Sequence, residues 1–216
     1  MEQNGDREPA GGLSAEAQSA KVQPAETQLA EALFAVVDLE TTGFDPSTDR
    51  IVQMAAVVVN GRGEIVESFD TLVKPESPEQ YEHGAEHVHG ISREMVEQEG
   101  MPLRAALSRI WSISEGRVFT AHNARFDIGF LEAESDRVGM SRRVTDYVDT
   151  LALARRLDSE RTRKHSLEAL CAHYGIERER AHEARSDATA TAKVLMHLIN
   201  DLGVADPGQL PELSGE

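Results

Sequence analysis

The first half of the folded region has strand-like hydrophobic patterning. Apolar runs rich in β-branched residues occupy positions 33–40, 50–59 and 64–73, and such runs are typical of strands that face a core. Asn60-Gly61 separates the second run from the third and is a strong signal for a tight hairpin turn. These three segments therefore predict an antiparallel meander.

The second half alternates helical spacing with short apolar runs. The pattern predicts helices at 102–114, 124–138, 150–157, 166–174 and 186–202, and short strands at 118–121 and 144–148. Gly175 and Gly203 directly follow the last two helices, where glycine commonly ends a helix. A meander followed by alternating helices and strands predicts an α/β fold, with a mixed sheet and helices on both of its faces.

Acidic segments flank this region. Residues 1–30 are rich in Glu, Gln, Ala, Gly and Pro, so we expect an acidic, disordered tail, with a weak helix over 14–32 as the alternative. We expect one folded domain at 31–203 and a short acidic tail at 204–216.

Length and composition indicate a cytoplasmic globular protein. The 216 residues are enough for one domain with a substantial core. Hydrophobic residues make up 40%, but no apolar run approaches the length that spans a membrane. We also see no secretion signal at the start of the chain. The single cysteine, Cys171, excludes an internal disulfide and fits a reducing compartment.

The net charge of −16 bears on the kind of partner. Residues 1–30 carry a net −3 and residues 201–216 a net −4, which leaves −9 on 31–200. Two bound divalent cations would reduce that remainder to −5. Negative charge disfavours tight, indiscriminate binding to duplex nucleic acid, because phosphate contacts need Lys and Arg. It does not exclude a nucleic-acid substrate.

Two carboxylates end the first predicted strand. Asp38 and Glu40 are two residues apart, so their side chains project from the same face. Two acids in this position repel each other and lose hydration, and a bound cation would offset both costs. Oxygen ligands suit Mg²⁺ or Mn²⁺ better than zinc. The alternative is a strand that leaves into solvent with two incidental acids.

Two more acids each follow a short predicted strand. Asp127 falls in the first turn of the helix that Asn123 is placed to cap, where an acid also interacts favourably with the helix dipole. Asp127 is therefore either a ligand or a helix-stabilising residue. Asp149 has the same setting, and for it we favour helix capping.

A histidine and an acid begin the last predicted helix. His182 and Asp187 are five residues apart, which is about 140° around a regular helix, so they do not share a helical face. They converge if His182 lies on the preceding loop and Asp187 in the first turn. A histidine beside a metal-bound acid is suited to accept a proton from water. A solvated loop histidine is the alternative.

Together these segments resemble the DEDDh family of 3′–5′ exonucleases, within the ribonuclease H-like superfamily. Residues 38–43 (DLETTG) match the first family motif, 122–127 (HNARFD) the second and 182–187 (HEARSD) the third. Residues 87–91 (HVHGI) resemble the segment between the first two motifs. The resemblance covers about residues 33–200, and in pattern it is similar to proofreading epsilon subunits of bacterial DNA polymerase III and free-standing epsilon-like nucleases.

The sister branch that has tyrosine in its third motif is disfavoured, because Glu183 stands at that position. The resemblance implies a ribonuclease H-like sheet and two divalent metal ions, Mg²⁺ or Mn²⁺. Their implied ligands are Asp38, Glu40, Asp127 and Asp187. His182 would be the general base on the attacking water, and the product a nucleoside 5′-monophosphate.

The residues around these motifs are candidates for binding substrate. We expect backbone amides of Thr41, Thr42 and Gly43 to hold the terminal nucleotide, and Phe44 to stack on a base or wedge beside it, with a loop anchor as the alternative for Phe44. Asn123 is a further candidate contact. A basic cluster would guide phosphates or form a solvated turn: Arg155, Arg156, Arg161, Arg163 and Lys164.

The leading hypothesis is a metal-dependent 3′–5′ exonuclease acting on single-stranded DNA ends in DNA repair, or in proofreading during DNA replication. Any proofreading would need a DNA polymerase in trans, because the sequence contains no polymerase domain. One alternative is a 3′–5′ exoribonuclease that trims RNA or short oligonucleotides. Another is a partner-dependent binding module of the same fold, although the presence of all four acids and His182 disfavours a module without catalysis.

Overall fold

The computed structural model describes Met1 and residues 25–76 and 81–215. The predicted disordered tail falls almost wholly outside these residues. Residues 25–30 of it belong to helix α1, Ala25–Glu31, and so differ from the predicted disorder; they lie within the segment where a weak helix was the alternative. Among the described residues, no helix is long and apolar enough to cross a membrane.

A six-stranded mixed sheet forms the centre of the molecule, with the strand order β4-β3-β2-β1-β5-β6. The first three strands pair antiparallel, and β5 and β6 continue the sheet in parallel with β1. Their bounds are β1 Leu33–Thr41, β2 Ile51–Asn60, β3 Ile65–Lys74, β4 Met101–Pro102, β5 Val118–Ala121 and β6 Tyr147–Asp149. The predicted meander and mixed sheet are confirmed.

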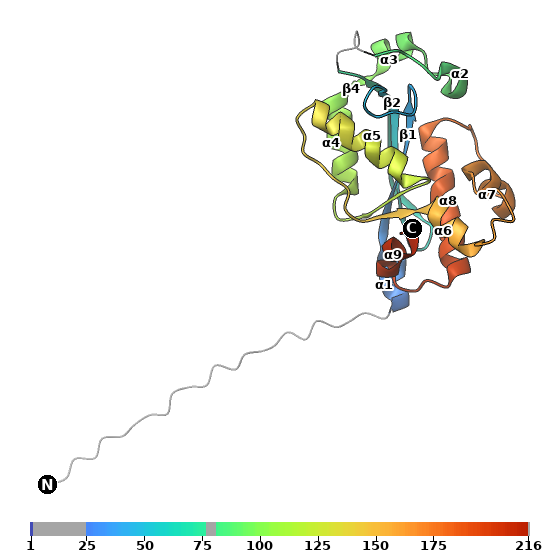
Figure 1. Cartoon of the computed structure of the whole chain (residues 1–216). Coiled ribbons are helices and arrows are strands. Elements are labelled where there is room, and N and C mark those ends of the chain that lie inside the picture. Colours follow the sequence, from blue (N-terminus) through green and yellow to red (C-terminus); the bar gives the residue numbers. More distant parts are fainter. Residues whose placement is uncertain (2–24, 77–80, 216) are drawn as a thin grey trace.

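Helices cover both faces of this sheet (Figure 1). Two of them follow the meander as α2 Glu86–His89 and α3 Arg93–Glu99. The larger ones are α4 Leu103–Ser114, α5 Ala124–Arg137, α6 Thr150–Leu157, α7 Leu167–Tyr174 and α8 Ala184–Leu202. The glycines predicted to end α7 and α8 do so with positive φ angles of 67° and 64°.

The alternation of side chains along β1 divides the core into two layers. Ala35 and Val37 pack into the layer that contains α4 and α5. Phe34 and Val36 pack into the layer that contains α6, α7 and α8. Because β1 is a central strand that is buried on both faces, its sequence is almost continuously apolar until the first acid, as expected for such a strand.

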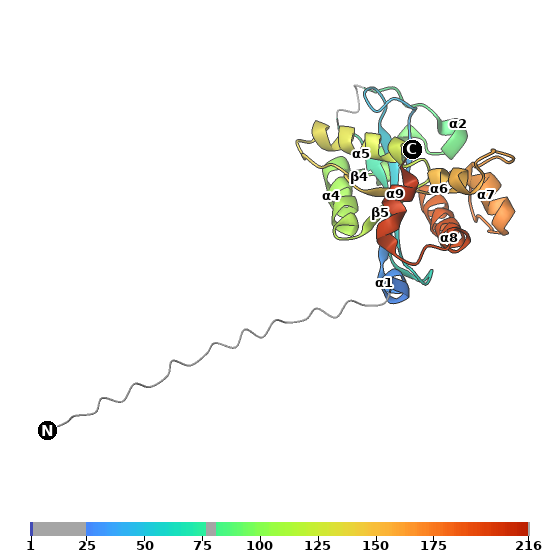
Figure 2. The same cartoon turned by 60° about the horizontal axis from the view of Figure 1, so that its bottom comes forward.

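The C-terminal segment belongs to the folded domain rather than to the short tail that we expected from residue 204. Pro207–Gln209 forms a 3₁₀ turn and Leu210–Ser214 forms helix α9, which contacts β6 and α6. Figure 2 shows α9 between the α4–α5 and α6–α8 groups. The side chain of Leu210 is fully buried. The segment has too few apolar residues for its periodicity to reveal this packing.

Candidate active site

The end of β1 supplies the first two acids of the site. Asp38 and Glu40 lie opposite Ala55 and Gln53 of β2. Because Leu39, between them, packs into the α4–α5 layer, the two carboxylates project from the opposite face, which is the side of α8. Both side chains are partly buried. The structure therefore places these acids on one face, as their spacing predicts.

Small side chains bring the start of α8 close to this strand. Ala184 and Ala188 pack against Ala55 and Val57 of β2 in a cluster of buried residues. The backbone amide of Ala184 also donates to Gln53 Oε1, at 3.1 Å. Alanine at these positions lets the helix approach the sheet closely, so the first turn of α8 reaches the acidic end of β1.

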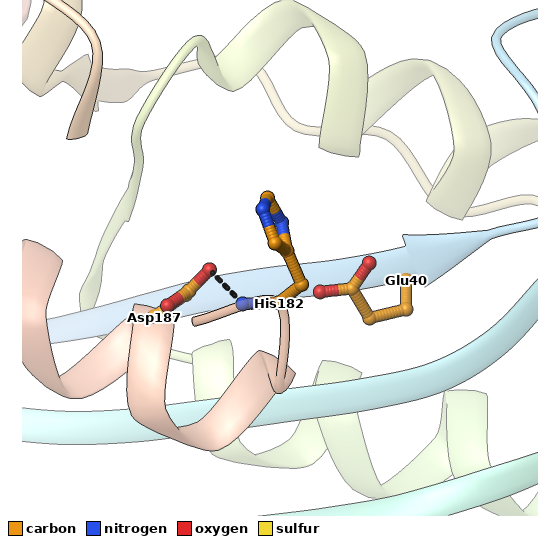
Figure 3. A group of neighbouring side chains, drawn as sticks. All are labelled: Glu40, His182 and Asp187. Carbon is orange, nitrogen blue, oxygen red and sulfur yellow. Dashed lines mark hydrogen bonds between the residues drawn. The ribbon is translucent and has the colours of Figure 1, made fainter. Parts of the chain in front are cut away.

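His182 and Asp187 meet Glu40 at this junction (Figure 3). One ligand atom from each of the three residues lies within 4.8 Å of the other two. His182 is an exposed loop residue with φ 61°, and its backbone amide donates to Asp187 Oδ2 at 3.2 Å. Asp187 is buried in the first turn of α8. This is the loop-and-helix arrangement in which the two residues converge.

Asp127 enters from the first turn of α5 and is 4% exposed. Asn123 precedes that helix in the left-handed conformation, and its side chain makes no capping bond. This differs from the capping role that we gave it, and its side chain is exposed. Its backbone amide instead donates to Asp149 Oδ1 at 2.9 Å. Asp149 also accepts from Leu151 N, which confirms that it caps α6.

The four acids act on one another electrostatically. Burial raises the pKa of Asp38 well above its usual range, and the negative charges of Asp127 and Asp187 raise it further. Burial and the charge of Asp187 raise the pKa of Glu40 to about 7. The pKa of Asp127 is also raised, chiefly by burial. Oxygen ligands that are concentrated and mutually repelling in this way fit one or two divalent cations.

Arg178 is a residue of the site that the sequence did not single out. Its Nε donates to Asp187 Oδ1 at 3.0 Å, and its Nη2 donates to the same oxygen. Its positive charge also lowers the pKa of Asp38 and Glu40, against the effect of burial. Arg178 lies in the irregular segment between α7 and α8, where no periodicity or spacing connects it to Asp187.

The loop after β1 carries the other substrate candidates. Thr41 and Thr42 are buried, and Thr41 Oγ1 donates to Gly43 O at 2.7 Å. The amide of Thr42 donates to Arg50 O at 2.9 Å. It is therefore not available to a nucleotide, which differs from our expectation. Phe44 is 89% exposed, and its ring meets Phe126 edge-on with centroids 6.4 Å apart.

The basic cluster predicted from the sequence begins in the last turn of α6 and continues in the segment after it, next to the second motif. His122 Nδ1 lies 2.9 Å from Thr150 Oγ1, and burial lowers the pKa of His122 to about 4, so its ring is neutral at neutral pH. A contact with the backbone of His165 and the charge of Arg155 also influence that pKa. The basic cluster therefore lies beside the second motif.

The chain is similar to known proteins in sequence and in fold. The exonuclease family model RNase_T matches residues 35–195. A PolC-type DNA polymerase III from Thermotoga maritima is 34% identical over 169 residues, which are 78% of this chain and 12% of the relative. The chain therefore spans only a small part of the length of such relatives.

Two solved structures have similar folds. E. coli exonuclease I in complex with a dT13 oligonucleotide has a TM-score of 0.70 and 23% identity, over 80% of this chain and 42% of that one. Exonuclease X in complex with 5′ overhanging duplex DNA has a TM-score of 0.62 and 26% identity, over 84% of this chain and 99% of that one. The predicted ribonuclease H-like fold is confirmed.

Proposed function

Because the chain belongs to the exonuclease family, in the DEDDh group of the ribonuclease H-like superfamily, we propose that it is a two-metal-dependent 3′–5′ exonuclease. Its substrates are single-stranded DNA ends, from which it releases nucleoside 5′-monophosphates. The observation that carries the proposal is the meeting of Glu40, His182 and Asp187 within 4.8 Å, beside Asp38 and Asp127.

Four carboxylates hold the two metal ions, Mg²⁺ or Mn²⁺, in this proposal. Asp38, on which the charges of the other three acids act, would serve both ions, Glu40 and Asp187 would complete the more tightly held one, and Asp127 would reach the second. Two such ions supply activation of water and stabilisation of the leaving 3′ oxygen. The raised pKa values of Asp38, Glu40 and Asp127 support this assignment, since a cation would offset both the burial and the repulsion that raise them.

His182 accepts the proton of the attacking water. Its exposed position on the loop lets it meet a water molecule that enters from solvent, and its ring lies beside Glu40 and Asp187. The bond from its backbone amide to Asp187 holds the loop against the metal ligands, so the ring is positioned by the same residue that would bind metal.

The surrounding loops bind the strand. Phe44 stacks on a base or wedges beside it, while Thr41, Gly43 and Asn123 contact the terminal nucleotide. The basic cluster at the end of α6 and in the segment after it guides the phosphates farther along the strand. The dT13 oligonucleotide bound to E. coli exonuclease I and the overhanging duplex bound to exonuclease X support DNA as the substrate.

The relation to PolC-type polymerases supports a role near DNA synthesis. In this proposal the chain proofreads with a DNA polymerase in trans or trims ends during repair. A cytoplasmic location fits the single cysteine, Cys171, whose side chain is 3% exposed.

The test is digestion of one sequence as single-stranded DNA and as RNA, each labelled at its 3′ or 5′ end, with Mg²⁺ or Mn²⁺. We expect metal-dependent shortening from the 3′ end and faster cleavage of DNA. Asp38→Ala should abolish cleavage, because it removes the bridging carboxylate. His182→Ala should keep Mn²⁺ binding and lose most of the turnover.

Asp136→Ala is the matched control, because Asp136 is an exposed acid of α5 that pairs with Arg143. It should cleave at the wild-type rate. An active Asp38→Ala variant would overturn the proposed metal site. Faster digestion of RNA would replace DNA with RNA as the substrate. If the folded protein cleaves neither strand, the binding-module alternative is favoured.

A further inference from the structure

One face of α5 holds the loop that presents Phe44. Phe126, Phe130, Glu134 and Arg137 are spaced by four, four and three residues, so they form a stripe along this helix. Phe126 contacts the Phe44 ring at the start of the stripe. Next to the stripe, the backbone of Gly129 lies close to Pro46 of the loop. The loop therefore follows the helix for most of its length.

Arg137 binds the tip of the loop directly. Its Nη2 donates to Pro46 O at 2.5 Å and to Ser47 O at 2.8 Å. Its Nη1 lies 3.2 Å from Glu134 Oε1, an ion pair without hydrogen-bond geometry. Glu134 is 1% exposed. A buried ion pair contributes little net stability in general, so its role here is to orient the guanidinium.

Arg50 completes the attachment from the other end of the loop. Its Nη1 donates to Thr48 O at 2.8 Å and to Asp49 O at 2.9 Å. Four consecutive carbonyl groups, from Pro46 to Asp49, therefore accept hydrogen bonds from two guanidinium groups. The Asp49 carboxylate in turn accepts from the Asp45 amide at 2.9 Å. These bonds fix the backbone of the loop.

The consequence is a fixed relation between an exposed aromatic ring and a metal ligand. Phe44 is 89% exposed and is followed by the loop that Arg137 holds. Asp127 is the residue after Phe126, on the same turn of α5. The ring and the carboxylate thus share one helix as their support. A ring held in this way has little conformational entropy to lose when a base stacks on it.

We propose that Arg137, oriented by Glu134, is a positioning residue that fixes Phe44 against the second base from the 3′ end, on the far side of the scissile phosphate. This inference rests on the proposed function. It makes the enzyme selective for chains that have a second base, because Phe44 stabilises the transition state only when such a base is present. A phosphodiester with one base gains nothing from the ring.

The test compares kcat/KM for a single-stranded DNA oligonucleotide with kcat/KM for the p-nitrophenyl ester of thymidine 5′-monophosphate, which has no second base. Arg137→Met should lower the ratio of the two values by about tenfold, within the range that one stacked base contributes. Phe44→Ala should lower it by a similar factor. The double variant should show the same ratio as either single variant, because both changes remove one interaction.

Arg143→Met is the matched control. Arg143 donates to the carboxylate of Asp136 on α5, and not to the two loop carbonyls that Arg137 binds. Its ratio should equal that of the wild type. If Arg137→Met does not fold, Arg137→Lys replaces it, because a single ammonium group does not reproduce the fork that binds two carbonyls. The lysine variant should still show a lowered ratio.

A wild-type ratio in the folded arginine variant would overturn the inference. A double variant whose loss in the ratio is the product of the two single losses would also overturn it. An equal fall of kcat/KM on both substrates would do the same, because it indicates a general structural role. These outcomes differ from failure of the proposed function. In that case the wild-type protein hydrolyses neither substrate.

Discussion

Helix α5 carries buried charge at both of its ends. At its first turn, Asp127 joins three other carboxylates, and Arg178 is the cation that reaches them. At its last turn, Glu134 lies beside Arg137, with the charge of Arg50 also acting on it. The acid of α5 is buried at both ends, but the first end has an excess of negative charge and the second an excess of positive charge.

The pKa values of two acids separate these environments. Burial raises the pKa of Asp127, and the acids Asp149 and Glu40 raise it further. Burial also raises the pKa of Glu134, but Arg137 and Arg50 oppose that effect. The chain therefore neutralises the second group with its own side chains. It leaves the first to be neutralised from outside, as expected of a metal site.

The largest expected difference between the two ends is in stability. Glu134→Ala should lower the free energy of unfolding by about 3 kcal/mol, because it removes a buried carboxylate and leaves the partly buried guanidinium of Arg137 without its partner. Asp38→Asn should raise the stability of the metal-free protein at pH 8, since it removes one of several mutually repelling charges. Urea denaturation with EDTA present measures both changes.

Asp136→Ala is the control for these variants. Asp136 is 53% exposed in its ion pair with Arg143, so its loss should cost at most about 1 kcal/mol. Equal effects of Glu134→Ala and Asp136→Ala on the free energy of unfolding would contradict the proposed difference between the two ends of α5. Destabilisation by Asp38→Asn as large as that by Glu134→Ala would also contradict it.

The second-largest expected effect is on the pH dependence of stability. The pKa of Glu40 rises from its ordinary 4.5 to about 7 in the folded protein, so the folded state holds this proton more tightly than the unfolded state. The resulting stabilisation is complete below pH 4.5 and is lost as the pH rises through 7. The metal-free protein should therefore lose stability over this interval, and Glu40→Gln should reduce the loss.

Denaturation at several pH values, with and without Mn²⁺, measures this effect. Added Mn²⁺ should offset the loss at high pH, because a cation replaces the proton on the carboxylates. An unchanged slope in Glu40→Gln would show that the titration of Glu40 is not coupled to folding.

The smallest expected effect is that of an Arg178 substitution on metal affinity. Because its guanidinium occupies Asp187 Oδ1, Arg178→Gln should tighten Mn²⁺ binding several-fold, which is on the order of 1 kcal/mol. Calorimetric titration with Mn²⁺ measures the change. Arg180→Gln, a neighbouring exposed arginine, should bind as the wild type does. Unchanged or weaker binding in Arg178→Gln would show that the guanidinium does not compete with the metal.

The central part of the fold was predictable because its signals are local. The meander was visible as three apolar runs with a hairpin turn at Asn60-Gly61, and β1, β2 and β3 follow it. The last helix was expected from 186 and begins at Ala184. Helix α9 was missed, because Leu210 is buried by tertiary packing rather than by a periodic pattern.

Parts of the candidate site were equally local. The shared face of Asp38 and Glu40 follows from the two-residue period of a strand. The meeting of His182 with Asp187 needed a loop at the right place, which the pattern allowed but did not require. The network around Arg137 has no local signal, since its bond to Pro46 joins residues 91 positions apart.

The sequence by itself determined the long strands, the larger helices and the identity of the acids, because hydrophobic periodicity and motif spacing depend on neighbouring residues. The tertiary structure decided which charges meet. Arg178 reaches Asp187, and Arg137 reaches the loop after β1, because helices pack on a sheet at distances that their small and large side chains set. Those packing distances depend on residues far apart in the chain, so contacts of this kind appear only in the folded molecule.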